Sequence, residues 1–112
     1  MSNKRIRIMI FPAHPAQVFH AAQHAIATHT RRPVHTEGIT VHGSIEASLW
    51  SWGENLSVMV EPDAAGAKVT ASSRSALATQ IIDYGRHRKN VEAIQALMEQ
   101  SLERSARVIS PG

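Results

Sequence analysis

A chain of 112 residues can form one domain with a single hydrophobic core but is too short for two. It contains no cysteine, which excludes disulfides, thiolate metal sites and cysteine nucleophiles. The formal charge of +3 comes without any basic run interleaved with aromatic residues, which argues against nucleic-acid binding. The segment 1–11 is too short and too charged for a signal peptide or a membrane span. We therefore expect one cytoplasmic domain over residues 1–112, with no membrane association.

The first part of the sequence predicts a strand followed by a helix. Basic and apolar residues alternate from 5 to 10, which places Ile6, Ile8 and Ile10 on one face that we expect to be buried. Pro12 ends this strand, and Pro15 suits the first turn of a helix. From 16 to about 28 apolar residues recur at helical spacing and form one face: Val18, Phe19, Ala22, Ala25 and Ile26.

The middle of the chain predicts an antiparallel meander. Residues 34–52 are expected to be extended, with Gly38 and Gly43 allowing a turn, a bulge or a strong twist. The composition of 53–55 suits a hairpin turn, after which apolar and polar residues alternate over 56–61. A second turn over 62–66 leads to another alternating strand over 67–73.

The last element is predicted to be the longest helix, from about Asp83 to Arg104. The carboxylate of Asp83 suits a helix N-cap and the positive end of the helix dipole. One face carries His87, Val91, Ile94, Met98 and Leu102, and the glutamates lie opposite. The end of the chain, Ser110-Pro-Gly112, is expected to be frayed.

This order of elements predicts an α+β fold in two layers, with an antiparallel sheet of four to five strands packed on two helices. The long C-terminal helix closes the arrangement. We expect one core formed by the following residues: Ile6, Ile8, Ile10, Phe19, Ile26, Val58, Val60, Val91, Ile94 and Met98.

Two resemblances support this fold. The opening Ile10-Phe-Pro-Ala-His-Pro-Ala-Gln-Val-Phe19, the meander and the long last helix resemble the helix-grip fold of START and Bet v 1-like proteins. Those proteins commonly enclose a hydrophobic ligand between the sheet and the C-terminal helix. The resemblance therefore implies a small hydrophobic ligand in the same place, although the chain is short for that family.

The second resemblance covers residues 45–97 and looks like a bacterial family of unknown function, the DUF fourteen-ninety-nine type. It rests on Ser73-Arg-Ser75 at the end of a strand, followed by Asp83-Tyr-Gly85 and Asn90 at the start of the final helix. The sequence departs from that pattern at 76–79, where the family often has a second Ser-Arg. This resemblance implies a bacterial origin but carries no established activity.

The densest polar set surrounds the start of the last helix and allows two interpretations. In the first, a helix N-terminus and the fork of donors on Arg74 bind an anion or a small ligand. In the second, the set locks the strand-to-helix turn: Asp83 caps the helix, Arg74 pairs with Asp83, and Asn90 bonds buried backbone groups. The set consists of Arg74, Thr79, Gln80, Asp83 and Asn90.

Trp50 and Trp52 flank one residue and so share a strand face, where they either pack in the core, line a pocket or form an exposed interface patch. His20 and His24 have a spacing that can bind a metal, but no third ligand is fixed near them, so we expect no metal and no cofactor. The candidate ligand-binding residues are Trp50, Trp52, Arg74, Thr79, Gln80, Asp83, His87 and Asn90.

Three functional hypotheses follow. The first is a binding domain that holds a small hydrophobic ligand between the sheet and the last helix. The second is an interaction domain, including a homodimer, that uses the open face or an edge of the sheet. The third is an anion binder or an enzyme built around Arg74 and the helix start at Asp83. The sequence has no glycine-rich phosphate loop and no nucleophile elbow, which favours a protein that is not an enzyme.

Overall fold

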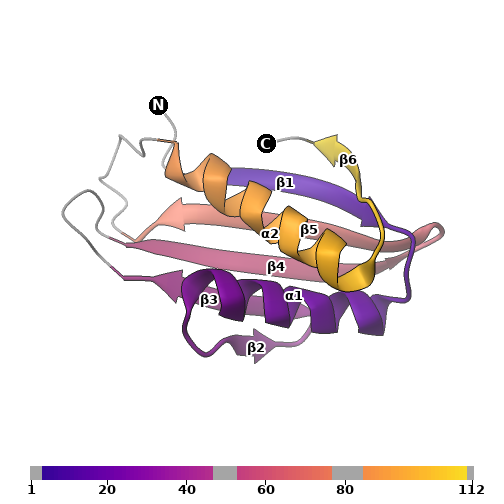
Figure 1. Ribbon diagram of the computed structural model, residues 1–112, viewed down its shortest axis with the longest axis horizontal. Coiled ribbons are helices and arrows are strands. Elements are labelled where there is room, and N and C mark those ends of the chain that lie inside the picture. The colour runs from indigo at the N-terminus through magenta and orange to yellow at the C-terminus, as the bar shows by residue number, and fades with distance from the viewer. Residues whose placement is uncertain (1–3, 47–52, 77–84, 111–112) are drawn as a thin grey trace.

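The computed structural model describes residues 4–46, 53–76 and 85–110. Within these ranges two helices lie on one face of a six-stranded antiparallel sheet (Figure 1). The elements are, in chain order, β1 (Lys4–Phe11), α1 (Pro15–Thr30), β2 (His35–Glu37), β3 (Thr40–Ile45), β4 (Glu54–Asp63), β5 (Gly66–Ser75), α2 (Arg86–Leu102) and β6 (Arg107–Ser110). The predicted two-layer α+β fold is confirmed, with one strand more than the largest sheet expected.

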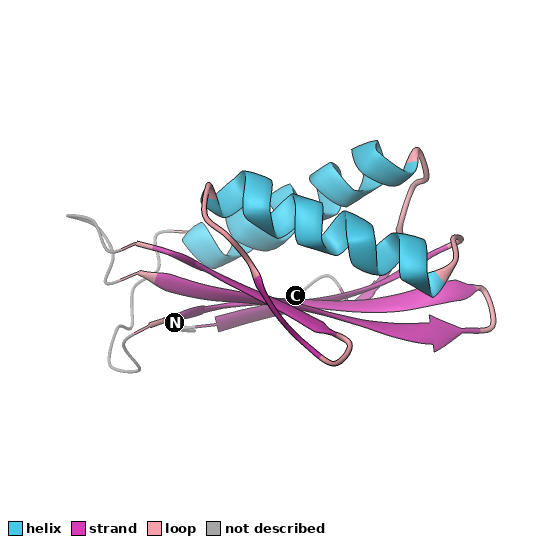
Figure 2. Cartoon of the chain, turned by 90° about the horizontal axis from the view of Figure 1, so that it is seen from below, coloured by secondary structure: helices cyan, strands magenta, loops and turns pink. Residues whose placement is uncertain are grey.

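The strand order across the sheet is β2-β3-β4-β5-β1-β6. Strands β2 to β5 form a meander, and β1 pairs with the side of β5 that faces away from β4. Both helices cover the same face, and Figure 2 shows the other face of the sheet open. Neither helix is long and apolar enough to cross a membrane, in the part of the chain that the structure describes.

The core lies between the helices and the covered face of the sheet. It includes fully buried side chains from both helices, such as Ile26 and Ile94, and from the strands beneath them, such as Leu56 and Val69. Gly43 shows how closely the layers meet, because a Cβ at this position would overlap Cγ2 of Ile26. The side chain of Ile26 therefore fills the space that this small residue leaves on the covered face of β3.

The prediction for the inward face of β1 was wrong. Met9 and Phe11 are fully buried in the core, whereas Ile6 points to the open face and is 38% exposed. The side chains that alternate with Ile6 face the helices, and Nη1 of Arg7 donates a 2.8 Å hydrogen bond to Oε1 of Gln95 on α2. Ile10 is buried, but it is not part of the core cluster. Of the remaining predicted core residues, Phe19 packs against the cluster, Ile8 on the open-face side of β1 lies outside it, and the others belong to it.

Three boundaries also differ from the prediction. The last helix begins at Arg86 after Gly85, whose φ of 77° lies in the left-handed region that glycine tolerates best, so the helix start expected at Asp83 is too early. Glu54 and Asn55 do not form a turn but pair with β3. After the last helix Arg107–Ser110 forms β6, which pairs with β1 and was not predicted; of the frayed end expected at 110–112, only Ser110 lies within the described residues, and it ends β6.

Candidate functional site

A pocket of about 460 Å³ opens where α2 begins. Its lining residues come from the end of α1, the end of β3, the start of β4 and the first turns of α2: His29, Ile45, Glu54, Arg86, Lys89 and Asn90. These segments meet because the two helices run in opposite directions across the sheet, so that the end of α1 lies beside the start of α2 (Figure 1). The sheet supplies the floor, since β3 and β4 pair through Ile45 and Glu54.

A chain of hydrogen bonds runs from the pocket into the protein interior. Oδ1 of Asn90 lies 2.8 Å from Nε2 of His29, and Nδ2 of Asn90 donates to Oγ of Ser73 at 2.9 Å. Oγ of Ser73 lies 2.7 Å from Nδ1 of His87, and Oγ of Ser75 lies 3.1 Å from Nε2 of the same ring. Since an amide oxygen only accepts, His29 donates in the first of these bonds. The network joins α1, α2 and β5 at one point.

Ser73 and His87 have the distance of a nucleophile and its base, but their surroundings suit a structural role. Both residues are 0% exposed, so no substrate reaches the serine hydroxyl. Both ring nitrogens of His87 have serine partners, as buried polar groups require. The pair therefore holds the first turn of α2 against β5.

The pocket has cations on its helical wall and hydrogen-bonding groups at its base. Arg86 and Lys89 come from the first turn of α2, where the helix dipole adds positive potential. Nε of Arg86 is buried and has no hydrogen-bond partner among the described residues. Glu54 and Asn90 are 2% and 4% exposed. Arg86 and Lys89 give the pocket two formal positive charges against the one negative charge of Glu54, so the lining favours a ligand with an anionic group, and half-buried Ile45 adds apolar surface beside it.

The structure brings together only part of the residue set predicted from the sequence. His87 and Asn90 lie in the same buried network, whereas Arg74 is exposed on the opposite face of the sheet, beside Lys4 and Asn55. The other predicted residues lie outside the described ranges: Trp50, Trp52, Thr79, Gln80 and Asp83.

Sequence reasoning missed His29, Glu54, Ser73 and Ser75. Each of them had a periodic signal. Glu54 continues the buried alternation of Leu56 and Val58 on β4, and the two serines continue that of β5. His29 follows Ile26 by three residues and so lies near the apolar face of α1. A polar residue in phase with a buried apolar face was therefore the signal that could have identified the site.

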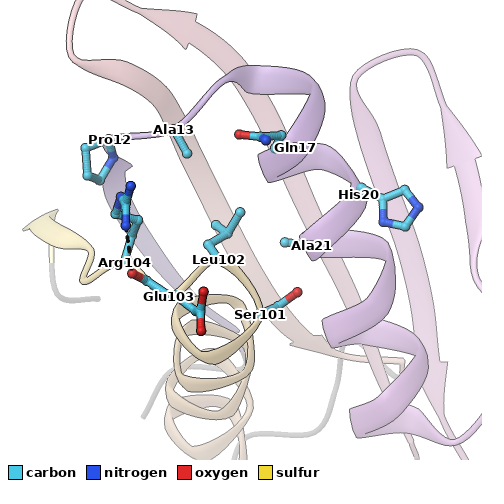
Figure 3. Close-up of a pocket in the computed structure, with 9 residues that line it drawn as sticks. All are labelled: Pro12, Ala13, Gln17, His20, Ala21, Ser101, Leu102, Glu103 and Arg104. Atoms are coloured by element: carbon cyan, nitrogen blue, oxygen red, sulfur yellow. Dashed lines mark hydrogen bonds between the residues drawn. The ribbon is translucent and has the colours of Figure 1, made fainter.

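A second pocket, of about 470 Å³, lies at the opposite end of the helices (Figure 3). It is formed by the start of α1 and the end of α2, with Gln17 and His20 on one helix and Ser101 on the other. All polar side chains that line it are exposed, unlike Glu54 and Asn90 in the first pocket. No three histidine or acidic side chains converge at a possible metal site, His20 and His24 included, in the ranges that the structure covers.

Comparison with known proteins supports the fold alone. No protein-family model matches the sequence, so the resemblance to the DUF fourteen-ninety-nine type is not supported. The search of curated proteins also found no match to the sequence. The crystal structure of Ara h 8.0201, a Bet v 1 homologue, is similar with a TM-score of 0.51 and 11% identity, over 89% of this chain and 99% of that chain. The crystal structure of TTHA0849 from Thermus thermophilus gives a TM-score of 0.44 and 16% identity, over 89% and 95% of the two chains. The chain thus has the Bet v 1-like helix-grip outline that its sequence predicted.

Proposed function

We propose that this protein binds a small amphipathic organic acid in the pocket at the start of α2. The observation that carries the proposal is the pocket itself, in which Arg86 and Lys89 form a cationic wall next to the side chain of Ile45. Arginine and lysine favour an anionic head group, and Ile45 favours an apolar substituent. The buried network behind Asn90 fixes the first turn of α2, which preorganises the wall before a ligand binds.

The packing beneath the rest of α2 supports this position. Val91, Ile94 and Met98 are each 0% exposed, and the small residue Gly43 is covered by Ile26. The ligand expected between the sheet and the last helix would therefore contact the beginning of that helix. The proposal is one of binding without catalysis, because the serine and histidine that lie close together are inaccessible to a substrate.

Octanoate, octanol and octylamine test this proposal, because they share an alkyl chain and differ in the head group. Isothermal titration calorimetry of the purified chain should show octanoate binding more tightly than the other two. Replacing Arg86 and Lys89 together with glutamine should weaken octanoate binding at least tenfold, since a hydrogen bond to a charged group contributes about 1.5–3 kcal/mol. Arg88→Gln is the matched control, because Arg88 lies in the same helical turn, pairs with Glu92 and does not line the pocket.

Equal affinity for octanoate and octanol would show that the pocket does not recognise an anionic head group. If none of the three compounds binds, the proposal that this pocket binds amphipathic ligands is wrong. An equal loss of affinity in Arg88→Gln would show that the net charge of the helix, and not the wall of the pocket, attracts the acid.

A second candidate function is self-association through β6. This strand forms one edge of the sheet, and its residues Val108 and Ile109 are 37% and 51% exposed. Free edge strands with apolar side chains pair readily with a second copy. Sedimentation equilibrium should then report a dimer that Ile109→Lys converts to a monomer, and a monomeric wild-type chain would exclude this function.

A further inference from the structure

The open face of the sheet carries another concave surface, on the side away from both helices. It has a volume of about 280 Å³, and its polar lining residues are Lys4, His42, Asn55, Ser57, Ser72 and Arg74. Ile6 adds an apolar edge. The sequence linked Arg74 to the start of the last helix, but the structure separates the two by the thickness of the sheet.

Strand register arranges these side chains in two adjacent rows. In the first row Arg74 on β5 lies opposite Lys4 on β1 and opposite Asn55 on β4. In the second row Ser57 on β4 lies between Ser72 on β5 and His42 on β3. Residues two apart on a strand share a face, so both rows point away from the helices.

The first row places two cations directly opposite each other. Like charges in such a cross-strand pair destabilise a sheet, because their Cβ atoms lie only about 5 Å apart. None of the described residues that line the surface is acidic. Beside the second row, Oε1 of Glu37 lies 3.7 Å from Nε2 of His42. An anion beside Arg74 would be attracted by both positive charges.

The rest of the lining supplies hydrogen-bond donors for such an anion. The amide of Asn55 and the ring of His42 each carry N–H groups. The hydroxyls of Ser57 and Ser72 lie 2.6 Å apart, and their mutual bond uses only one of the two hydroxyl hydrogens. Arg74 adds a planar fork that matches a tetrahedral oxyanion, and Lys4 adds a compact charge.

We propose that this surface is a binding site for the phosphate group of a small molecule. The volume suits a phosphate with a short substituent better than a drug-sized ligand, which needs roughly 300–1,000 Å³. The site is independent of the pocket at the start of α2, because Arg74 points away from the helices while its neighbours Ser73 and Ser75 are buried beneath them. If phosphate does not bind on the open face, the proposal for the pocket at the start of α2 is unaffected, and the reverse also holds.

Inorganic phosphate is the probe, titrated into ¹⁵N-labelled protein at constant ionic strength against sodium chloride. Saturable chemical-shift changes are expected at the backbone amides of Ser57, Ser72 and Arg74, with a millimolar dissociation constant. Arg74→Gln should weaken binding at least tenfold. Lys68→Gln is the matched control, since Lys68 lies on the same face of β5 but outside the lining, and it should bind as the wild type does.

The melting temperature separates binding from folding. Arg74 is exposed, so in chloride Arg74→Gln should melt close to the wild type, and phosphate should raise its melting temperature less. Absence of saturable shifts in the wild type, or an equal loss of affinity in Lys68→Gln, would overturn the site. A single-stranded decathymidylate that binds more than a hundredfold more tightly than phosphate would overturn the small-molecule assignment in favour of a polymer.

Discussion

His87 joins the start of α2 to β5 through two buried hydrogen bonds. It is fully buried, and its two nitrogens bond to Ser73 and Ser75 on β5. A typical hydrogen bond contributes only about 1 kcal/mol net, but a buried group left without its partner costs about 1–3 kcal/mol. The position therefore tolerates an apolar side chain only if its partners become apolar as well.

We expect His87→Leu to lower the free energy of unfolding by about 2–4 kcal/mol, because two buried hydroxyls lose their partner. Adding Ser75→Ala to the same chain should recover part of this loss, because Ser75 bonds to His87, whereas Ser73 also accepts a hydrogen bond from Asn90 and must be kept. Urea unfolding followed by circular dichroism measures both variants. A double variant as unstable as His87→Leu would mean that the bond to Ser75 contributes little to the stability.

At the scale of single elements, an isoleucine on α2 and an isoleucine on β1 differ in burial. Ile94 is fully buried in the centre of α2, whereas Ile6 on β1 lies on the open face. Ile94→Ala should cost about 2–5 kcal/mol, as removal of core methyl and methylene groups does. Ile6→Ala should cost less than about 1 kcal/mol because the site is exposed. Similar losses for the two variants in urea unfolding would contradict this assignment of the two faces.

The sequence identified most elements correctly, but not the inward face of β1. Alternation shows that a strand has two different faces, yet it does not say which face meets the core when both carry apolar residues. Met9 and Phe11 alternate with Ile8 and Ile10, so each face of β1 had its own apolar pair. The structure selects the face of Met9, and Arg7 on that face reaches the edge of α2, where Gln95 accepts its hydrogen bond.

From the sequence, only those residues of the candidate site that lie on the same helix could be grouped together. His87 and Asn90 lie one turn apart on a single helix, so their common face could be seen in the sequence. Glu54 and His29 reach the same pocket from β4 and α1, and their meeting depends on sheet order and helix direction. Arg74 was grouped with the helix start at Asp83, which lies outside the described residues; alternate side chains of β5 lie on opposite faces, and this places Arg74 on the open face.

At the scale of the whole molecule, β5 separates two surfaces of different chemistry. Its side chains at Ser73 and Ser75 support the helix that forms the first pocket, while Ser72 and Arg74 form part of the open face. Both surfaces lie at the end of the sheet where β5 finishes and α2 begins. The two proposed sites therefore share no side chain, so their proposed ligands would not compete with each other.

The last prediction concerns cooperativity. A single core cluster includes residues from both helices and from β1, β3, β4 and β5, so none of these six elements can unfold without exposing part of it. Small single domains with one core unfold in a two-state transition. Differential scanning calorimetry should give one peak, with an unfolding enthalpy of about 80 kcal/mol near 60 °C for a chain of this length. The calorimetric and van't Hoff enthalpies should agree, and far-ultraviolet circular dichroism and tryptophan fluorescence should share one midpoint. Separate midpoints would mean that unfolding is not two-state and that part of the chain unfolds independently of the common core.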